Sequence, residues 1–233
     1  MLGILVLLIA SWLLLYLTTK DNLKALGVLP SWLQLCWVLI GFIITAALCV
    51  EAQLVEAWLM GGSWQAVKNV EWLLIRNATW WDVKSVLTEE LVFRGALLYL
   101  LWHYMGSKVA VTISASAFGI YHWFSFGVLG HFLPMILVFL GTGLMGVVLA
   151  WSFIQAKSLW APFGIHLGWN FTQNTLFSKG PLGTLAFELK GGQAIEGWAS
   201  LFNFINNMLI PPLVLLLILY WFQSKYKANP PNM

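Results

Sequence analysis

Charge is what this sequence has least of. Only 9% of its 233 residues are Asp, Glu, Lys or Arg, whereas 60% are hydrophobic. Soluble domains are about 25% charged, so the composition excludes an ordinary water-soluble domain. The net charge is only +3 and the chain has no block of basic residues, so nothing indicates a nucleic-acid partner. We expect a polytopic helical membrane protein.

Cysteine is equally scarce. The two cysteines, Cys36 and Cys49, lie thirteen residues apart in one apolar run. A helix of that length is about 20 Å long, so the two thiols cannot form a disulfide with each other. We expect both to be small core hydrophobes, which gives no information about the redox compartment.

Long apolar runs, in contrast, fill the sequence. A membrane span needs about 20 apolar residues, and seven stretches qualify. Residues 51–84 combine charges with five tryptophans, a pattern typical of one or two interfacial helices or of a re-entrant segment. We expect an all-α transmembrane bundle of about seven to eight spans, forming one domain over residues 1–233, with its third span starting near Asp82 or Ser85. The expected spans are 1–19, 30–50, 85–105, 109–126, 132–154, 159–178 and 206–223.

The stretch 88–94 is the most unusual one for a membrane protein, because it contains three charged side chains. Ionisable groups at membrane depth usually face a bundle interior or a water-filled cavity. Glu90 and Arg94 are four residues apart, so on a helix they share a face in the order that favours an ion pair. Glu89 lies about 100° from Glu90 on the same helix and has no local partner. We predict that Glu90 and Arg94 form a structural pair and that Glu89 is free for chemistry.

Three polar side chains on other apolar stretches could join Glu89: His122, His166 and Asn170. His166 and Asn170 are four residues apart and therefore share one helix face. One carboxylate, two imidazoles and one carboxamide suit the activation of a water molecule and the stabilisation of an oxyanion. We therefore predict a hydrolytic site within the membrane.

The stretch that carries His166 also contains Gly164 and Gly168, which are four residues apart on a different face. Small residues at this spacing let two helices approach closely in a membrane. We predict that the glycine face packs tightly while the opposite face presents the imidazole and the amide to a cavity.

Each of these features is weak when it stands alone. A Glu-Glu-x-x-x-Arg stretch can be a structural ion pair, and a single histidine in a helix is more often a satisfied core residue. The prediction depends on their occurrence in this order on three separate apolar stretches.

At these residues the sequence resembles a known family. Residues 89–94 (EELVFR) match an EExxxR motif, residues 118–122 (FGIYH) match FxxxH, and residues 166–170 (HLGWN) match HxxxN. The three motifs, within about residues 80–178, resemble the CPBP family, which includes type II CAAX prenyl endopeptidases and related bacterial bacteriocin-processing or immunity proteins. The resemblance implies an intramembrane glutamic protease that uses no metal and no other cofactor.

The resemblance also implies a role for each motif residue. Glu89 and His122 would position and activate the water, and His166 and Asn170 would hold the oxyanion. Glu90 and Arg94 would support the site, which agrees with the helical argument given above.

Other functions remain open from the sequence. Two histidines and a carboxylate are credible zinc ligands, although the chain has no His-Glu-x-x-His signature. A non-catalytic peptide-binding or immunity protein could contain the same residues, and a proton-coupled carrier could use them as a relay. The carrier ranks last because no paired broken helices are evident. A serine protease is also less favoured, since Ser114, Ser116 and Ser125 near His122 have no distinctive motif around them.

The expected partners are a membrane-associated peptide or protein substrate, either prenylated or a leader peptide, and the lipid bilayer. We expect a multi-pass integral protein of a bacterial plasma membrane. Nothing in the sequence identifies the substrate or the oligomeric state.

Overall fold

The computed structural model describes residues 2–179 and 183–228, and helices make up most of this part of the chain. A short 3₁₀ helix covers Leu23–Leu26, and two π-helical segments cover Phe171–Leu176 and Ile205–Leu209. The α-helices of the described residues are α1 (Leu2–Thr18), α2 (Trp32–Met60), α3 (Trp72–Arg94), α4 (Ala96–Ser125), α5 (Phe132–Ala156), α6 (Trp160–Asn170), α7 (Gly197–Phe204) and α8 (Ile210–Ala228).

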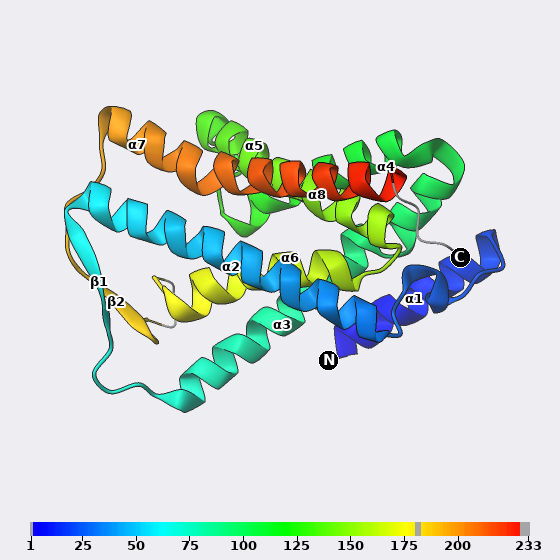
Figure 1. The fold of residues 1–233 in the computed structure, drawn as a ribbon, viewed down its shortest axis with the longest axis horizontal. Helices are drawn as coiled ribbons and strands as arrows, with labels where there is room; N and C mark the ends of the chain where they lie inside the picture. Colours follow the sequence, from blue (N-terminus) through cyan, green and yellow to red (C-terminus); the bar gives the residue numbers. More distant parts are fainter. Residues whose placement is uncertain (1, 180–182, 229–233) are drawn as a thin grey trace.

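The expected helical fold class is confirmed, but a small sheet is added to it. Strand β1 (Gly62–Ala66) pairs antiparallel with β2 (Phe187–Gly191), so that Gly62 lies opposite Gly191. Figure 1 shows the two strands at one end of the molecule, next to the end of α2. The sheet joins part of the stretch 51–84, where interfacial helices or a re-entrant segment were expected, to the segment between α6 and α7.

Three helical segments are long and apolar enough to cross a membrane: α2, α5 and the continuous helix Gly197–Ser224. Helix α1 is apolar but shorter. These findings, which cover the described residues, fit a membrane protein, but they do not confirm the predicted seven to eight spans.

The region 51–84 differs from its prediction. Helix α2 continues to Met60, strand β1 follows, and α3 already begins at Trp72. Asp82 and Ser85 therefore lie inside a helix, and the prediction that one of them caps the third span was wrong. Asp82 is fully buried. Its carboxylate accepts hydrogen bonds from side chains of a distant segment and does not cap a helix.

The expected span 85–105 is divided between α3 and α4 at Gly95. The backbone there leaves the helical region with ψ −139°, and a Cβ atom at Gly95 would collide with the carbonyl oxygen of Leu91. Gly106 interrupts α4 again with φ 81°, a conformation that glycine adopts without strain. The break at Gly95 places the charged end of α3 against the helices that follow it.

The last helical segment is continuous. Helix α7, the π-helical turn and α8 follow one another without a break, and Pro211 and Pro212 come directly after the π-helical turn. Proline supplies no backbone N–H, and a π turn changes the hydrogen-bond register just before it. The two prolines therefore lie within one continuous helical segment.

Helices α6 and α2 pack backbone to backbone at two glycines. A Cβ atom at Gly164 would collide with the backbone of Val38, and one at Gly168 with the carbonyl oxygen of Phe42. The predicted close-packing face of α6 is confirmed. His166 lies on another face, which points toward α3.

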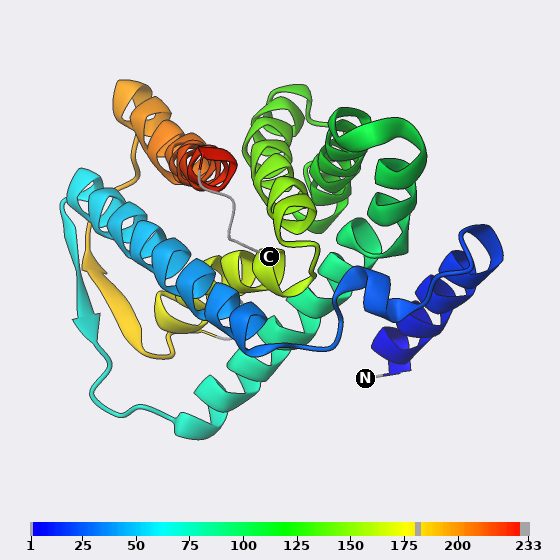
Figure 2. The ribbon, with the colours of Figure 1, turned by 45° about the vertical axis from the view of Figure 1, so that its right-hand side comes forward.

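The candidate site lies among α3, α4 and α6, between two buried apolar clusters. One cluster joins α1 to α3, α4 and α5. The other is centred on Phe118, Val148, Leu149 and Ile165 and extends to Leu215 of α8. In Figure 2, α2, α6 and the end of α3 lie next to one another while α5 and α4 cover the other side.

Candidate active site

The last two turns of α3 carry the charged residues. Glu90 and Arg94 are both fully buried, and Glu90 Oε1 lies 3.5 Å from Arg94 Nη1. Their spacing of four residues places them on one helix face, so the predicted ion pair is present. Two charges that would each be costly to bury alone are thus neutralised together.

Glu90 also contacts α6. The same Oε1 atom lies 2.7 Å from His166 Nδ1, and all of these groups are buried. A carboxylate accepts hydrogen bonds, so Nδ1 carries the hydrogen and donates it to Glu90. Glu90 therefore connects α3 to α6 and fixes the orientation of the His166 ring.

Glu89 faces the other nitrogen of that ring. Its Oε2 lies 3.8 Å from His166 Nε2, which is too long for a direct hydrogen bond. Its Oε1 accepts a hydrogen bond of 3.3 Å from Ser85 Oγ, whereas Oε2 has no hydrogen-bond partner among the described residues. Glu89 thus offers one carboxylate oxygen next to the His166 imidazole.

Phe118 lies at the centre of the site. The Arg94 guanidinium lies 4.2 Å from the centre of its ring, and the ring centres of His122 and His166 lie 4.4 Å and 5.8 Å from it. The guanidinium nitrogens form no hydrogen bond within the described part of the chain. Cation–π attraction to the Phe118 ring compensates in part for these missing hydrogen bonds. Phe118 thus brings Arg94 and both histidines to one place.

His122 is oriented by its own helix. Its Nδ1 lies 2.8 Å from the carbonyl oxygen of Phe118, so Nδ1–H donates and Nε2 keeps its lone pair. No ion pair joins His122 to Glu89 or Glu90 in the residues that the structure describes. His122 Nε2 thus remains an acceptor that no described residue uses.

Asn170 is the last residue of α6, and the π-helical segment Phe171–Leu176 follows it at once. Its side chain is partly buried and forms no hydrogen bond with another described residue. Single π turns inside helices occur frequently at functional sites. The position of the Asn170 amide depends on how this π turn is held.

Asp82 holds the π turn and was not predicted as a site residue. Its carboxylate accepts hydrogen bonds of 2.9 Å from Asn174 Nδ2 and 2.8 Å from Thr175 Oγ1. Asp82 is seven residues before Glu89, which is two helical turns and therefore nearly the same face. This periodicity could have suggested Asp82, but its partners are more than 90 residues away.

The described residues include no group of three or more His, Cys, Asp or Glu side chains arranged to hold a metal ion. The geometry therefore gives no support to the zinc hypothesis raised from the sequence.

Comparison with known proteins identifies the class. Residues 72–172 match the model of the family described as type II CAAX prenyl endopeptidase Rce1-like, and all six predicted site residues lie within this range. This part of the chain is similar to that family, which confirms the resemblance predicted from the three motifs. No curated protein and no solved structure matches the chain. The family indicates a peptidase, and together with the apolar helices it indicates an integral membrane protein.

Proposed function

We propose that this protein is an intramembrane glutamic endopeptidase that hydrolyses a peptide bond in a membrane-associated substrate. The observation that supports this most directly is the position of Glu89. One of its oxygens has no hydrogen-bond partner among the described residues and faces the His166 ring at 3.8 Å. A water molecule beside this gap could contact both groups.

In the proposed reaction, Glu89 acts as the general base. Its carboxylate takes a proton from the water as the water oxygen attacks the carbonyl carbon of the scissile bond. His122, whose Nε2 is an acceptor, holds the second hydrogen of the water. Glu89 then gives this proton to the nitrogen of the scissile bond as the C–N bond breaks and the amine leaves. One carboxyl group thus acts as the base in the first step and as the acid in the second.

The oxyanion that forms on the substrate needs donors. Asn170 supplies its amide N–H, and His166 donates from Nε2 when both of its ring nitrogens carry a proton. Donors placed where charge develops stabilise the transition state. Glu90 and Arg94 orient His166 and do not contact the substrate.

The remaining expectations form part of the same proposal. The chain is one transmembrane domain over residues 1–233 with its functional core at about 80–178, and it crosses a bacterial plasma membrane several times. Its substrate is a peptide or protein that is either prenylated or carries a leader segment. No metal or other cofactor takes part.

The proposal is tested with purified full-length protein in detergent micelles or vesicles. Synthetic peptides with and without a farnesylated cysteine near the C-terminus are incubated with wild-type protein, Glu89→Gln and the control Glu51→Gln, and products are read by mass spectrometry. We expect cleavage to fall by about 10²–10⁴-fold in Glu89→Gln, as for loss of a general base. Glu51 is exposed and takes no part in the hydrogen bonds and ion pairs described for the site, so Glu51→Gln should cleave normally.

Two outcomes would contradict the proposal. Unchanged cleavage by folded Glu89→Gln would exclude Glu89 as the base. A folded wild-type protein that binds peptides but never cleaves them would favour a peptide-binding or immunity function.

A further inference from the structure

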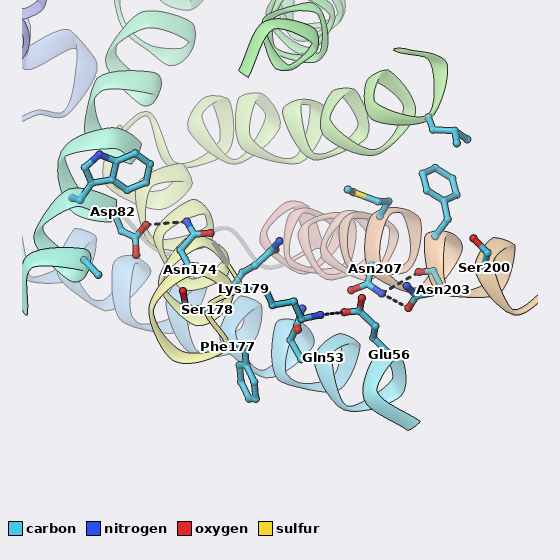
Figure 3. A pocket seen from close by; sticks show the side chains of 16 residues that line it. Gln53, Glu56, Asp82, Asn174, Phe177, Ser178, Lys179, Ser200, Asn203 and Asn207 are labelled. Atoms are coloured by element: carbon cyan, nitrogen blue, oxygen red, sulfur yellow. Dashed lines mark hydrogen bonds and ion pairs between the residues drawn. The ribbon is translucent and has the colours of Figure 1, made fainter. Parts of the chain in front are cut away.

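A large cavity with a mixed wall of apolar side chains and amides lies beside the site but is not formed by the residues assigned to the reaction. Its volume is about 930 Å³, and Figure 3 shows its side chains coming from α2, α3, the π-helical segment and the helix that follows Gly197. The cavity wall includes the five carboxamides of Gln53, Gln173, Asn174, Asn203 and Asn207. We call it the amide-lined cavity.

Most of this cavity is built outside the family-matched region. Gln53 and Glu56 precede residues 72–172, and the lining residues from Gln173 to Met208 follow them. The cavity is therefore largely a property of the flanking segments of this chain, whereas the predicted reacting groups all lie inside the match.

The charged groups of the cavity wall offer a ligand no accessible unpaired charge. Glu56 forms an ion pair with Lys179. Asp82 forms no ion pair with another described residue, but it is fully buried and both of its oxygens accept hydrogen bonds, from Asn174 and Thr175. Burying a charge without a partner is costly, so the cavity suits an uncharged ligand.

Asn203 and Asn207 offer one donor and one acceptor side by side. Asn207 Nδ2 donates to Asn203 Oδ1 at 2.7 Å, which leaves Asn203 Nδ2 and Asn207 Oδ1 without partners among the described residues. In an extended peptide the N–H and C=O of one residue point to the same side, so such a residue presents the complementary donor and acceptor. Figure 3 shows both side chains on the wall opposite Asn174.

Gln53 adds a further hydrogen-bonding group to the cavity wall. Its side chain is only 4% exposed, lines the cavity, and its Oε1 has no hydrogen-bond partner in the described chain. A buried acceptor without a partner is unfavourable. Rotation about the terminal torsion of glutamine is soft, so a ligand N–H in the cavity could satisfy this oxygen.

The cavity has a defined separation from the reacting groups. Asp82 lies at the cavity and Glu89 at the site, and seven residues of helix α3 between them correspond to about 10 Å. An extended peptide covers 10 Å with about three residues. A substrate running along α3 from Glu89 would thus enter the cavity about three residues from its scissile bond.

We propose that the amide-lined cavity is a subsite for an extended, uncharged peptide segment that begins about three residues from the scissile bond. This deepens the proposed function and rests on it for the position of the scissile bond. Asn203 and Asn207 bind the N–H and C=O of one residue of this segment, and Gln53 accepts a hydrogen bond from the segment. The subsite selects uncharged side chains and requires a substrate that extends beyond three residues on that side.

The test uses full-length protein in detergent and a library of 16-residue peptides with varied sequence, whose cleavage sites are read by mass spectrometry. Wild-type protein should disfavour Asp, Glu, Lys and Arg by at least tenfold at positions about three to five residues from the cut, on one side only. Peptides truncated to two residues on that side should be cleaved at least tenfold less efficiently.

Variants of the cavity sharpen the test. Gln53→Leu and Asn207→Leu should each raise KM for a preferred peptide by up to about tenfold, the equivalent of one hydrogen bond, and leave kcat within about twofold. Gln155→Leu, which replaces an amide that lines a different cavity, should change neither constant. Two cavity variants are used so that poor folding of one does not decide the result.

A binding measurement separates this proposal from proteolysis. Fluorescent uncharged and charged peptides are titrated into Glu89→Gln and into Glu89→Gln/Gln53→Leu, with fluorescence anisotropy as the signal. Binding of the uncharged peptides that is weakened by Gln53→Leu supports the subsite, even if wild-type protein cleaves nothing. The proposal is overturned if charged and uncharged peptides bind equally, or if the cavity variants leave binding and cleavage preferences unchanged.

Discussion

The glutamate cluster (Glu89, Glu90, Arg94 and His166) and the wall of the amide-lined cavity each contain an ion pair, and the two pairs differ in their access to water. Glu90 and Arg94 are both 0% exposed, whereas Lys179 and Glu56 are 43% and 22% exposed. A buried charge that loses its partner keeps its full desolvation cost, while an exposed charge is solvated instead. The ion pair is therefore essential to the structure of the cluster, whereas the Lys179–Glu56 pair is incidental to that of the cavity.

The two regions also differ in chemistry. The cluster consists of ionisable groups in direct contact, which suits proton transfer. The cavity wall combines apolar side chains with five neutral amides that can donate and accept hydrogen bonds, which suits recognition of a peptide. Because both regions lie along helix α3, the protein can hydrolyse the peptide bond at the cluster and select its substrate at the cavity.

The sharpest way to test the comparison is to remove the positive partner from each ion pair. Arg94→Met should lower the free energy of unfolding by about 3–5 kcal/mol, since Glu90 is left buried and unpaired. Lys179→Met should lower it by no more than about 1 kcal/mol. Unfolding is followed by circular dichroism during titration with denaturing detergent, and equal losses in the two variants would contradict the comparison.

A second variant acts where the two regions meet. Asp82→Ala should lower the free energy of unfolding by about 1–3 kcal/mol, because buried Thr175 then lacks its acceptor. It should also lower kcat, since the π turn after Asn170 is no longer held. Asp82→Asn, which can still accept one of the two hydrogen bonds, should restore part of both. A variant that loses stability but keeps kcat would show that Asp82 does not position Asn170.

A smaller effect is expected at the edge of the cluster. His122→Ala should lower kcat by roughly tenfold, the equivalent of one hydrogen bond to the water, with KM unchanged. His103→Ala is the control, because His103 is exposed and contacts only the rings of Tyr99 and Tyr104 among the described residues. If both variants cleave peptides at the wild-type rate, His122 has no part in holding the water.

The smallest expected effect is that of metal removal. Cleavage should be unchanged after treatment with EDTA or 1,10-phenanthroline and dialysis, because Glu89 supplies the base without a metal. Activity that disappears with the chelators and returns with added zinc would revive the zinc hypothesis and reassign the histidines as ligands.

Local periodicity explains what could be predicted at the site. Glu90 and Arg94 pair because they are four residues apart on one helix, and Gly164 and Gly168 pack against α2 for the same reason. Both arrangements depend on the geometry of a single helix. The three motifs also predicted the family whose model matches residues 72–172.

Longer-range contacts could not be predicted in this way. His166 and Glu90 are 76 residues apart, and Asn174 and Asp82 are 92 residues apart. The end of α3 also depends on Gly95, where the backbone turns between two segments that read as one apolar span. Composition carries no information about which side chains such a turn brings together.

The sequence by itself determined that this chain is helical and apolar, that charge is concentrated at Glu89, Glu90 and Arg94, and which residue types are available for hydrolysis. Only the tertiary structure decided that His166 lies between the two glutamates, that Asp82 holds the π turn after Asn170, and that amides from distant segments line one cavity. The physical reason is that helix periodicity acts within a few turns, whereas the packing of helices places side chains from separate segments within hydrogen-bonding distance.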